Sequence, residues 1–438
     1  MVTSETQGIG VHHPDYVFGR LVEPDIMADP YPFYAHLRER GRLLLMPTTG
    51  LDLVAPADHF CWVTGHEEAL AVLRSPEAYR LARLPKPGDG PGPAHMSRLQ
   101  RAFAEEAMFS VDAAGHLRLR RSLTGYLTPK RVEALRANAQ RHCDDAMDRI
   151  VEQLRVEGVA DLHNGLIRPV AVQTLCDLIG IPGADGAWLE PLIRRMFPLS
   201  EPLVDDEAMA DVTVATEIVM NYFRDLSAQR RRRPQDDLAS ALVHRQEEDD
   251  DQRRLSQGEV ETLLWTILFL GFEANIAAMD NAVLQMLRYP QHATALAGNS
   301  DQVDAFVSEC LRHDPPTTMT GGTRVTARPL QIGDVVLPEN VDIRILTGAV
   351  NRDPSAFPDA DRFDPGRDTT ATFTFANGLR RCIAVHLVTM EMAVVLPKIY
   401  TTLPGLRVVG VPPRRHTYFW RVFERMDVSA DLSAMDLR

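Results

Sequence analysis

The chain contains 438 residues, of which 45% are hydrophobic and 24% are charged, as is typical of a folded globular protein. Its formal net charge of −13 argues against nucleic acid as a partner, because a negatively charged surface repels phosphate groups. Residues 1–20 lack the apolar core of a signal peptide, and the longest apolar run, Leu263 to Phe272, is too short to span a bilayer. We therefore expect a cytoplasmic protein without a membrane anchor.

Cysteine and lysine usage point to the same kind of source. The cysteines are scattered, with neither CxxC pairs nor zinc-site spacing, which fits a reducing compartment. They are Cys61, Cys143, Cys176, Cys310 and Cys382. Only three of the 47 basic residues are lysine, namely Lys86, Lys130 and Lys398, a bias that indicates a bacterial gene of high GC content.

The N-terminal quarter begins with a loose lead-in over residues 1–20. Asp29 to Arg38 then predicts a turn into a short helix, His59 to Thr64 a strand, and Glu67 to Leu73 a helix. The stretch from Pro85 to Pro93 is rich in proline and glycine and predicts a loop.

A helix is expected to begin at Gly115, and it places His116 and Arg120 four residues apart on one face. Taken alone, this pair would be a solvated helix face. Residues 130–245 predict several amphipathic helices that break at Gly158, at Gly180 and after Arg233. The acidic residues 247–251 predict a solvated loop.

A long helix follows. Ser256 and Glu259 form a capping-box pattern, and the helix is expected to run from about Gly258 to near Tyr289, where Pro290 ends it. At roughly 30 residues it would cross a whole domain. Its centre contains Leu270, Gly271, Glu273, Ala274 and Asn275.

Four charged residues with informative positions lie between this helix and the C-terminus. Glu309 and Arg312 are three apart on a predicted helix, a pattern that is usually an exposed pair. Arg362 lies in the segment 358–365, and Arg324 opens a strand-rich region that includes residues 335–337 and 341–346.

The most informative stretch ends at Cys382. Phe375 lies seven positions before this cysteine, Gly378 four before and Arg380 two before, and a periodic apolar run follows it, as on a helix. The cysteine would then sit at a helix N-terminus, where free N–H groups favour a thiolate. A buried structural cysteine is the alternative.

This spacing resembles the haem-binding loop of the cytochrome P-450 family, and the other features resemble that family's landmarks in order. The resemblance covers about residues 25–430 and implies one domain over 1–438. The implied fold is mainly α with a minor β region, a triangular helical prism with a long central helix over haem b. In such a fold the 85–93 loop would lie in the lid over the substrate pocket, although a plain surface loop is equally compatible.

The resemblance also implies roles for individual residues. Cys382 would be the proximal iron ligand, with Phe375 and Gly378 shaping its loop. His116, Arg120, Arg324 and Arg380 would neutralise the haem propionates. Glu309, Arg312 and Arg362 would form the family's structural triad.

The distal side departs from the family pattern at two positions. Leu270 stands where a small residue is usual, and Ala274 replaces the usual threonine, so its side chain cannot hydrogen-bond. Protons would then reach dioxygen through Glu273, Asn275, water or a substrate group, or would not be needed. The substrate pocket would include Leu270, Met319, Thr320, Phe419 and Trp420, with plain core packing as the alternative.

The implied function is oxidation of a small organic substrate by dioxygen, by hydroxylation, epoxidation or oxidative coupling, in specialised metabolism. A peroxide-dependent enzyme and a haem-thiolate sensor without turnover are alternatives. We expect a monomer that receives electrons from a ferredoxin and its reductase, with NADPH or NADH upstream. Arg118, Arg121 and Arg381 would either form the docking patch or be ordinary solvated arginines.

Overall fold

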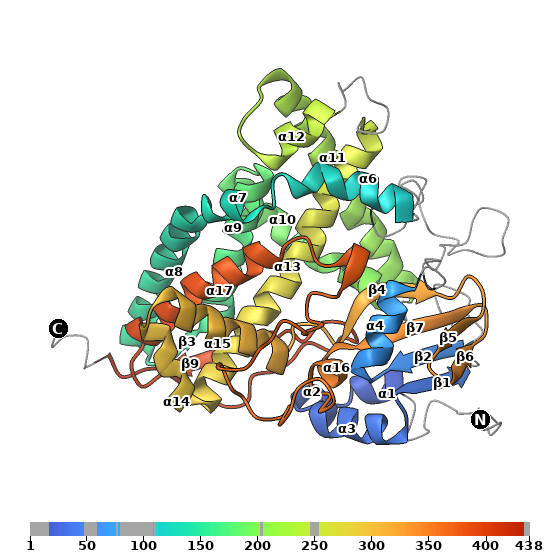
Figure 1. The fold of residues 1–438 in the computed structure, drawn as a ribbon. Helices are drawn as coiled ribbons and strands as arrows, with labels where there is room; N and C mark the ends of the chain where they lie inside the picture. The colour runs from blue at the N-terminus through green and yellow to red at the C-terminus, as the bar shows by residue number, and fades with distance from the viewer. Residues whose placement is uncertain are drawn as a thin grey trace.

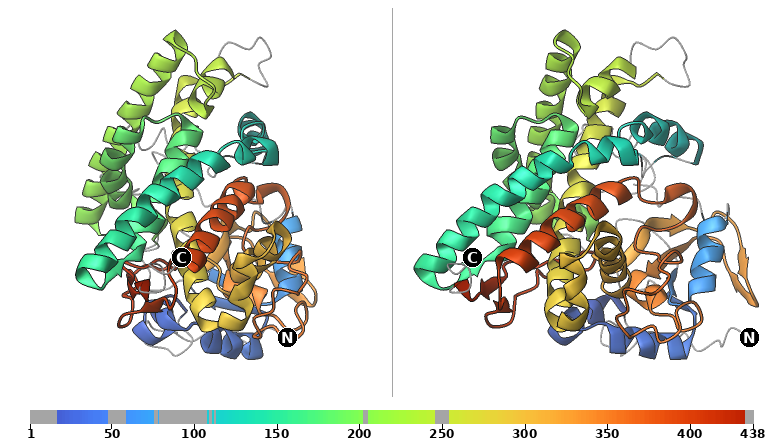
Figure 2. Two further views of the ribbon diagram at one scale, coloured as in Figure 1. Left: turned by 90° about the vertical axis from the view of Figure 1, so that its left-hand side faces the viewer. Right: turned by 60° about the vertical axis from the view of Figure 1, so that its left-hand side comes forward.

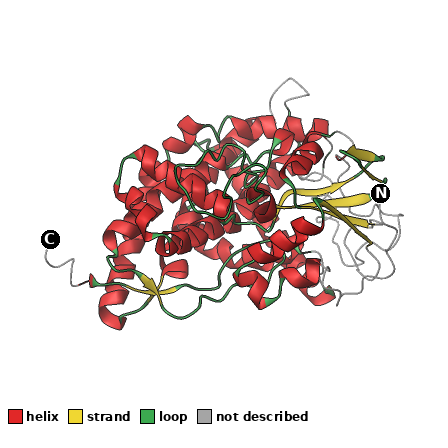
Figure 3. Ribbon diagram, turned by 60° about the horizontal axis from the view of Figure 1, so that its bottom comes forward, coloured by secondary structure: helices red, strands yellow, loops and turns green. Residues whose placement is uncertain are grey.

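The computed structural model describes residues 17–47, 59–75, 78, 108, 111, 113–201, 205–245 and 254–432. The loop 85–93, the acidic run 247–251 and most of the lead-in 1–20 lie outside these residues. Helices make up most of the described chain, and most of the strands gather at one end of it, whereas the short strands 160–161, 407–408 and 427–429 lie on the opposite side (Figures 1 and 3). The predicted class, mainly α with a minor β region, is confirmed.

The long central helix α13 spans Gln257–Arg288. The Ser256 side chain accepts from the Glu259 N–H, and the Glu259 side chain accepts from the Ser256 N–H, so the predicted capping box is present. Because α13 is apolar on nearly all sides, it can be stable only inside the protein. It packs against α9 (Arg168–Ile179), α11 (Asp206–Arg232), α15 (Ser300–His313) and α17 (Val385–Thr402). Figure 2 shows α13 (yellow) between these layers.

The helices before α13 end where the sequence predicts. α8 (Arg136–Glu157) ends at Gly158 and α9 ends at Gly180, and both glycines have positive φ, 75° and 92°. α11 ends before Arg233, which Pro234 follows. The remaining helices of this part are α6 (Ala113–Thr124), α7 (Pro129–Glu133), α10 (Gly183–Arg195) and α12 (Leu238–His244).

The main sheet joins distant parts of the chain. Its strand order is β1-β2-β7-β4, with bounds β1 (Leu43–Pro47), β2 (His59–Val63), β7 (Val341–Leu346) and β4 (Met319–Val325). β2 pairs in parallel with β7, across nearly 300 residues of chain, and the other two pairings are antiparallel. α3 (Tyr31–Arg40) and α4 (His66–Arg74) belong to the same end of the molecule (Figure 1).

The smaller elements complete the chain. Two further sheets pair β5 (Leu330–Ile332) with β6 (Val335–Leu337), and β3 (Ala160–Asp161) with β9 (Asp427–Ser429) and β8 (Arg407–Val408). The short helices are α1 (Val17–Leu21), α2 (Pro24–Ala28), α14 (Pro290–Ala293) and α16 (Thr347–Asn351), with a π-helical turn η2 (His163–Ile167). Short 3₁₀ turns are η3 (Phe197–Ser200), η5 (Thr294–Ala297) and η6 (Gly378–Arg380).

Glu309 and Arg312 form a fully buried ion pair on α15. Two N–O contacts of 2.7 Å join them, and both side chains have 0% exposure. Arg312 also donates to the carbonyls of Asn351 and Ala360 at 2.9 Å. The pair therefore ties α15 to two later segments of the chain.

The expectation that Arg362 completes this triad is wrong for its side chain. The Arg362 guanidinium is 66% exposed and pairs with Asp364 at 2.6 Å, while its backbone carbonyl accepts from Arg312. Arg367 takes the expected place instead: its side chain is 10% exposed, and its Nε lies 3.8 Å from Glu309 Oε1. A turn over 358–365 directs the nearer arginine outward and the later one inward.

By length and hydropathy alone, α13 would qualify as a membrane span among the described helices. The qualifying window is 83% buried within the protein, as expected for a core helix.

Candidate functional site

The loop before Cys382 is tightly turned. The N–H of Ala376 donates to Phe373 O at 2.8 Å, and the N–H of Cys382 donates to Phe375 O at the same distance. Gly378 has a φ of +72°, and a Cβ placed there would lie 3.2 Å from the backbone oxygen of Leu73. A side chain at this position would therefore be strained and crowded. The chain then enters α17, just after the cysteine, as predicted.

Asn351 and Thr374 hold this loop in place. Asn351 accepts from the Phe373 N–H at 2.7 Å and donates to the Thr374 hydroxyl at 2.8 Å. The Thr374 hydroxyl in turn donates to Leu311 O on α15 at 2.6 Å. Neither residue was predicted from the sequence, because nothing in the chain marks a partner more than 20 positions away.

Cys382 is exposed, although much of the protein is packed close around it. Burial raises the pKa of the thiol above its ordinary value, while the Ala384 N–H and the cationic side chains of Arg120 and Arg381 act in the opposite direction. The backbone N–H of Ala384, just before α17, thus donates to the Cys382 sulfur, as predicted for a helix N-terminus. A metal bound to the sulfur would shift this balance further towards the thiolate.

Three of the four predicted propionate partners come together near Cys382. His116 is buried, with Nδ1 3.0 Å from Met108 O, and burial together with the charges of Arg380 and Arg120 lowers its pKa. Arg120 donates to Arg381 O at 2.7 Å and Arg380 donates to Val111 O at 3.0 Å. The loop and α6 therefore meet at a site with several positive charges.

Arg324, the fourth predicted partner, comes from a different element. It lies on β4 opposite Ile343 of β7, and its side chain is fully buried at 2% exposure. A buried arginine requires anionic or hydrogen-bonding neighbours.

The middle of α13 carries one accessible strip. Leu270 is 39% exposed, and Gly271 and Ala274 are partly exposed, whereas the residues on either side are buried. Leu270 and Ala274 are four apart and share a face, as predicted. Gly271 faces α9, where a Cβ would approach Leu175 to 3.2 Å, so the glycine permits close helix packing.

Glu273 lies on another side of α13. Its side chain has 0% exposure, and Arg415 Nη2 donates to both carboxylate oxygens, at 3.2 and 3.3 Å. The Arg415 guanidinium also stacks over Phe197, 5.1 Å from the ring centre. Arg415 is 142 positions away in sequence, so no local pattern predicts this pair. Asn275 is buried too, and its Oδ1 has no hydrogen-bond partner among the described residues.

The predicted substrate-pocket residues divide into two groups. Met319, Thr320 and Trp420 are nearly fully buried, with exposures of 4%, 8% and 5%. Phe419 is half-buried and meets Trp420 edge-on at 4.6 Å, and Leu270 is the most accessible of the five. The burial of Met319, Thr320 and Trp420 therefore fits plain core packing at least as well as the lining of a substrate pocket.

The predicted basic docking patch is smaller than expected. Arg118 forms an ion pair with Glu259, at the start of α13, and donates to Arg254 O at 3.1 Å. Its charge is therefore largely compensated. Arg121 and Arg381 are exposed and form no ion pair with the described residues.

The residues around Cys382 fit a flat, dianionic cofactor such as haem. A cysteine with accessible surface can supply a thiolate ligand, and Gly378 lets the backbone turn without a side chain. Arg120 has no carboxylate partner in the described part of the chain, although a charge held beside a buried site needs one. His116, Arg120 and Arg380 would hold the carboxylates of the cofactor.

Comparison with known proteins agrees with this chemistry. The family model described as Cytochrome P450 matches residues 193–402. Cytochrome P450 BJ-3 of Bradyrhizobium diazoefficiens is 30% identical over 94% of this chain and 95% of its own length. The 6-deoxyerythronolide B hydroxylase of Saccharopolyspora erythraea is 30% identical over 87% of this chain and 92% of its own.

Solved structures share the fold. P450BioI in complex with an acyl carrier protein carrying hexadec-9Z-enoic acid has a TM-score of 0.82 and 24% identity, covering 93% of this chain and 100% of that one. Epothilone B-bound P450epoK also has a TM-score of 0.82, with 20% identity over 94% and 98%. From its relatives and its fold, this chain belongs to the cytochrome P450 family and is a haem b-containing oxidoreductase of the monooxygenase type.

Proposed function

We propose that this cytochrome P450 uses dioxygen to oxidise a small organic substrate in bacterial specialised metabolism, with Cys382 as the iron ligand. The observation that carries the proposal is the meeting of His116, Arg120 and Arg380 beside Cys382. A haem iron held by a thiolate supplies activation of dioxygen, because the ligand donates electron density that favours O–O cleavage. The protein must position the substrate, exclude water and deliver protons.

Proton delivery is the unusual part of this proposal. Ala274 offers no hydroxyl, and the Glu273 carboxylate is held by Arg415 on another side of α13. Asn275 is adjacent in sequence but buried. We therefore infer that a hydroxyl or amine of the substrate, or a water molecule that the substrate orders, donates the required protons at the Ala274 face.

The substrate class follows from relatives. One relative is named 6-deoxyerythronolide B hydroxylase and another is the cytochrome P450 monooxygenase PikC of Streptomyces venezuelae, which is 28% identical. The name of the first supports a biosynthetic intermediate that accepts a hydroxyl group as the substrate here, and the name of the second supports a monooxygenase reaction. The accessible side chains of Leu270 and Phe419 would contribute apolar surface to its site.

Electrons would come from a small acidic ferredoxin and its reductase. Arg121 and Arg381 remain as exposed positive charges on the cysteine side, and they would attract an acidic partner despite the negative total charge. We expect the enzyme to act in the cytoplasm as a monomer.

Reconstitution tests this proposal. Purified holoprotein would be incubated with 6-deoxyerythronolide B and related compounds, together with ferredoxin, ferredoxin reductase and NADPH. We expect an oxygenated product that depends on dioxygen and on every electron-transfer component. Binding of a compound without product, under conditions where the haem is reduced, would favour a sensor instead.

A peroxide-dependent enzyme is the second candidate, and Ala274 is the observation that favours it. When peroxide is the oxidant, a threonine that relays protons to dioxygen is not needed. The same substrates would be incubated with hydrogen peroxide and without ferredoxin. Faster product formation with peroxide than with the complete electron-transfer system would establish this alternative.

A further inference from the structure

Glu201 joins the connection between α10 and α11 to the C-terminal segment. It directly follows η3, and its Oε1 accepts from the Thr417 hydroxyl. Its Oε2 accepts from the Tyr418 N–H at 2.8 Å. These contacts cross 216 and 217 positions of the chain. They tie Glu201 to the turn that immediately precedes Phe419.

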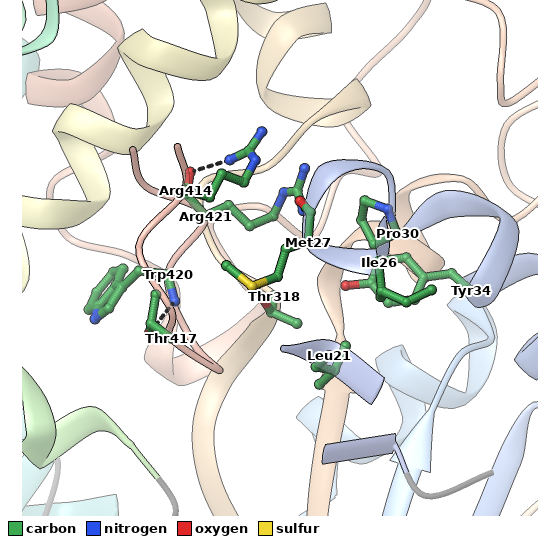
Figure 4. A pocket seen from close by; sticks show the side chains of 10 residues that line it. All are labelled: Leu21, Ile26, Met27, Pro30, Tyr34, Thr318, Arg414, Thr417, Trp420 and Arg421. Atoms are coloured by element: carbon green, nitrogen blue, oxygen red, sulfur yellow. Dashed lines mark hydrogen bonds between the residues drawn. The ribbon is translucent and has the colours of Figure 1, made fainter. Parts of the chain in front are cut away.

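The Thr417 hydroxyl extends this tie to the backbone of the following residues. It accepts from the N–H of Phe419 at 3.3 Å and from the N–H of Trp420 at 3.4 Å. The dashed line between Thr417 and Trp420 in Figure 4 marks the second of these bonds. Because the hydroxyl oxygen already serves as an acceptor, its own hydrogen is available for Glu201. The carboxylate and the hydroxyl thus form one network that fixes the backbone at Phe419.

The carboxylate of Glu201 depends on the same turn. Burial raises the pKa of this carboxyl, while the hydrogen bonds from Thr417 and Tyr418 act in the opposite direction. His416 and Arg415 also act to lower this pKa. All four residues belong to one short segment, so the carboxylate and the turn stabilise each other.

The turn is also held from its other side, without Glu201. The Thr318 N–H donates to Phe419 O at 2.9 Å, and the Arg421 N–H donates to Pro316 O at 2.9 Å. These bonds join the turn to the chain just before β4. Loss of the Glu201 contacts should therefore loosen the backbone around Phe419 without unfolding the C-terminal segment.

We propose that Glu201 is a positioning residue that holds Phe419 in the substrate site through Thr417. The inference rests on the proposed function, because it takes the half-buried side chain of Phe419 as part of the wall of that site. A wall that is in place before binding favours ligands that contact it, since the apparent affinity falls with the fraction of molecules in which the wall is displaced. Ligands too small to reach Phe419 should not depend on Glu201.

Binding of imidazole and of clotrimazole to the ferric holoprotein tests this inference. Both ligands present an imidazole nitrogen to the iron, but clotrimazole also carries bulky aromatic groups that occupy the substrate site. The shift of the Soret band gives the Kd of each ligand. Neither ligand needs an oxidant or electrons, so a failure of turnover in the reconstitution would leave this test intact.

Glu201→Ala should raise the Kd of clotrimazole about tenfold and leave that of imidazole unchanged. This factor is expected when the ligand must replace the free energy of a hydrogen bond to a charged group. Thr417→Val should have the same effect, whereas Thr417→Ser, which keeps the hydroxyl, should behave as wild type does. Glu207→Ala, at an exposed position in the first turn of α11, is the matched control and should also behave as wild type does.

A wild-type Kd of clotrimazole in Glu201→Ala and Thr417→Val would overturn the inference, and so would an equal rise in the Kd of imidazole. The Thr417 variants break the network from its other side, so they decide the test if Glu201→Ala does not fold.

Phe419→Ala separates a positioning role of Glu201 from a direct one. This change should itself raise the Kd of clotrimazole. Adding Glu201→Ala should cause no further rise, because the residue that Glu201 positions is gone. Independent effects of the two changes would mean that Glu201 does not act through Phe419. A wild-type Kd in Phe419→Ala would place Phe419 outside the substrate site and would overturn the inference as well, whatever the outcome of turnover.

Discussion

Glu273 and Ala274 are neighbours on α13 with opposite surroundings. Glu273 is buried against Arg415 and Phe197, whereas Ala274 belongs to the accessible strip with Leu270. A one-residue step on a helix turns the side chain by about 100°, which explains why adjacent residues cannot serve the same face. A proton relay from Glu273 would first require the Arg415 pair to open.

The first prediction concerns Ala274→Thr. If the substrate supplies the proton-donating group, wild type should couple NADPH consumption to product only with substrates that carry it. Analogues without that group should bind but lose electrons to peroxide or water. A general acid contributes about 10²–10⁴-fold in rate. The new hydroxyl should therefore clearly improve coupling for these analogues, and it should change the coupling of the true substrate little.

The measurement is product formed per NADPH consumed. Equal coupling of all analogues by wild type, with no effect of Ala274→Thr, would rule out substrate assistance. Protons would then have to come from the protein, through Asn275 or a displaced Glu273.

Arg120 provides the second residue-scale prediction. It lies beside Cys382 and forms no ion pair with the described residues, so a haem carboxylate would be its partner. Arg120→Ala should weaken haem retention by about 1.5–3 kcal/mol, the usual value of a hydrogen bond to a charged group. Transfer of haem to apomyoglobin measures this loss. Arg121→Ala, at the exposed neighbouring position, should retain haem as wild type does, and equal loss from both variants would argue against the clamp.

At the scale of elements, α15 and the segment after α16 are joined through buried charges. Glu309 and Arg312 pair inside the protein, and Arg367 rather than Arg362 approaches them. The family resemblance predicted the pair, which charge and spacing alone would have assigned to the surface, but the direction of each arginine depends on the intervening segment, which no local pattern encodes.

Arg362 and Arg367 can be compared directly. Arg367→Ala removes a mostly buried guanidinium that also donates to Asp359 O, so it should lower the free energy of unfolding by about 1–3 kcal/mol. Arg362→Ala should change it by less than about 0.5 kcal/mol, since its side chain is exposed. Urea unfolding measures both values. A larger loss of unfolding free energy in Arg362→Ala than in Arg367→Ala would show that Arg362 belongs to the triad after all.

The end of α15 should also respond to pH. Burial, together with the charge of Arg352, lowers the pKa of His313 to about 3. Between this value and the ordinary value of about 6.5, the unfolded state binds the proton and the folded state does not, so stability falls as the pH decreases through this range. From pH 7 to pH 5 the loss should be about 2 kcal/mol.

His313→Gln cannot titrate and should lose about 2 kcal/mol less than wild type over the same interval. The two proteins are compared by urea unfolding at both pH values. Identical pH dependence would mean that His313 does not carry the effect.

Local patterns predicted the elements better than their contacts. The capping box and Pro290 set the limits of α13 within a residue or so, and glycines marked the ends of α8 and α9. The parallel pairing of β2 with β7, the Asn351 contacts and the Glu273–Arg415 pair were not predictable in this way. Each joins residues far apart in sequence, so only the packed chain brings them together.

At the scale of the whole molecule, the fold brings α6 and the Cys382 loop to one region, and α13 packs against α17, the helix that follows this loop. His116 and Arg120 come from α6, Arg380 and Cys382 from the loop, and the accessible strip from α13. α6 comes from the first third of the chain, α13 from its middle and the Cys382 loop from near its end, so the site exists only in the folded protein. The proposed function depends first of all on Cys382 as the ligand of the haem iron.

The absorption spectrum of the ferrous carbon monoxide complex tests this ligation. Wild type should show the strongly red-shifted Soret band of thiolate ligation. Cys382→Ser should lose that band, while Cys310→Ser, which changes a buried cysteine of α15, should keep it. A red-shifted band that persists in Cys382→Ser would contradict the account.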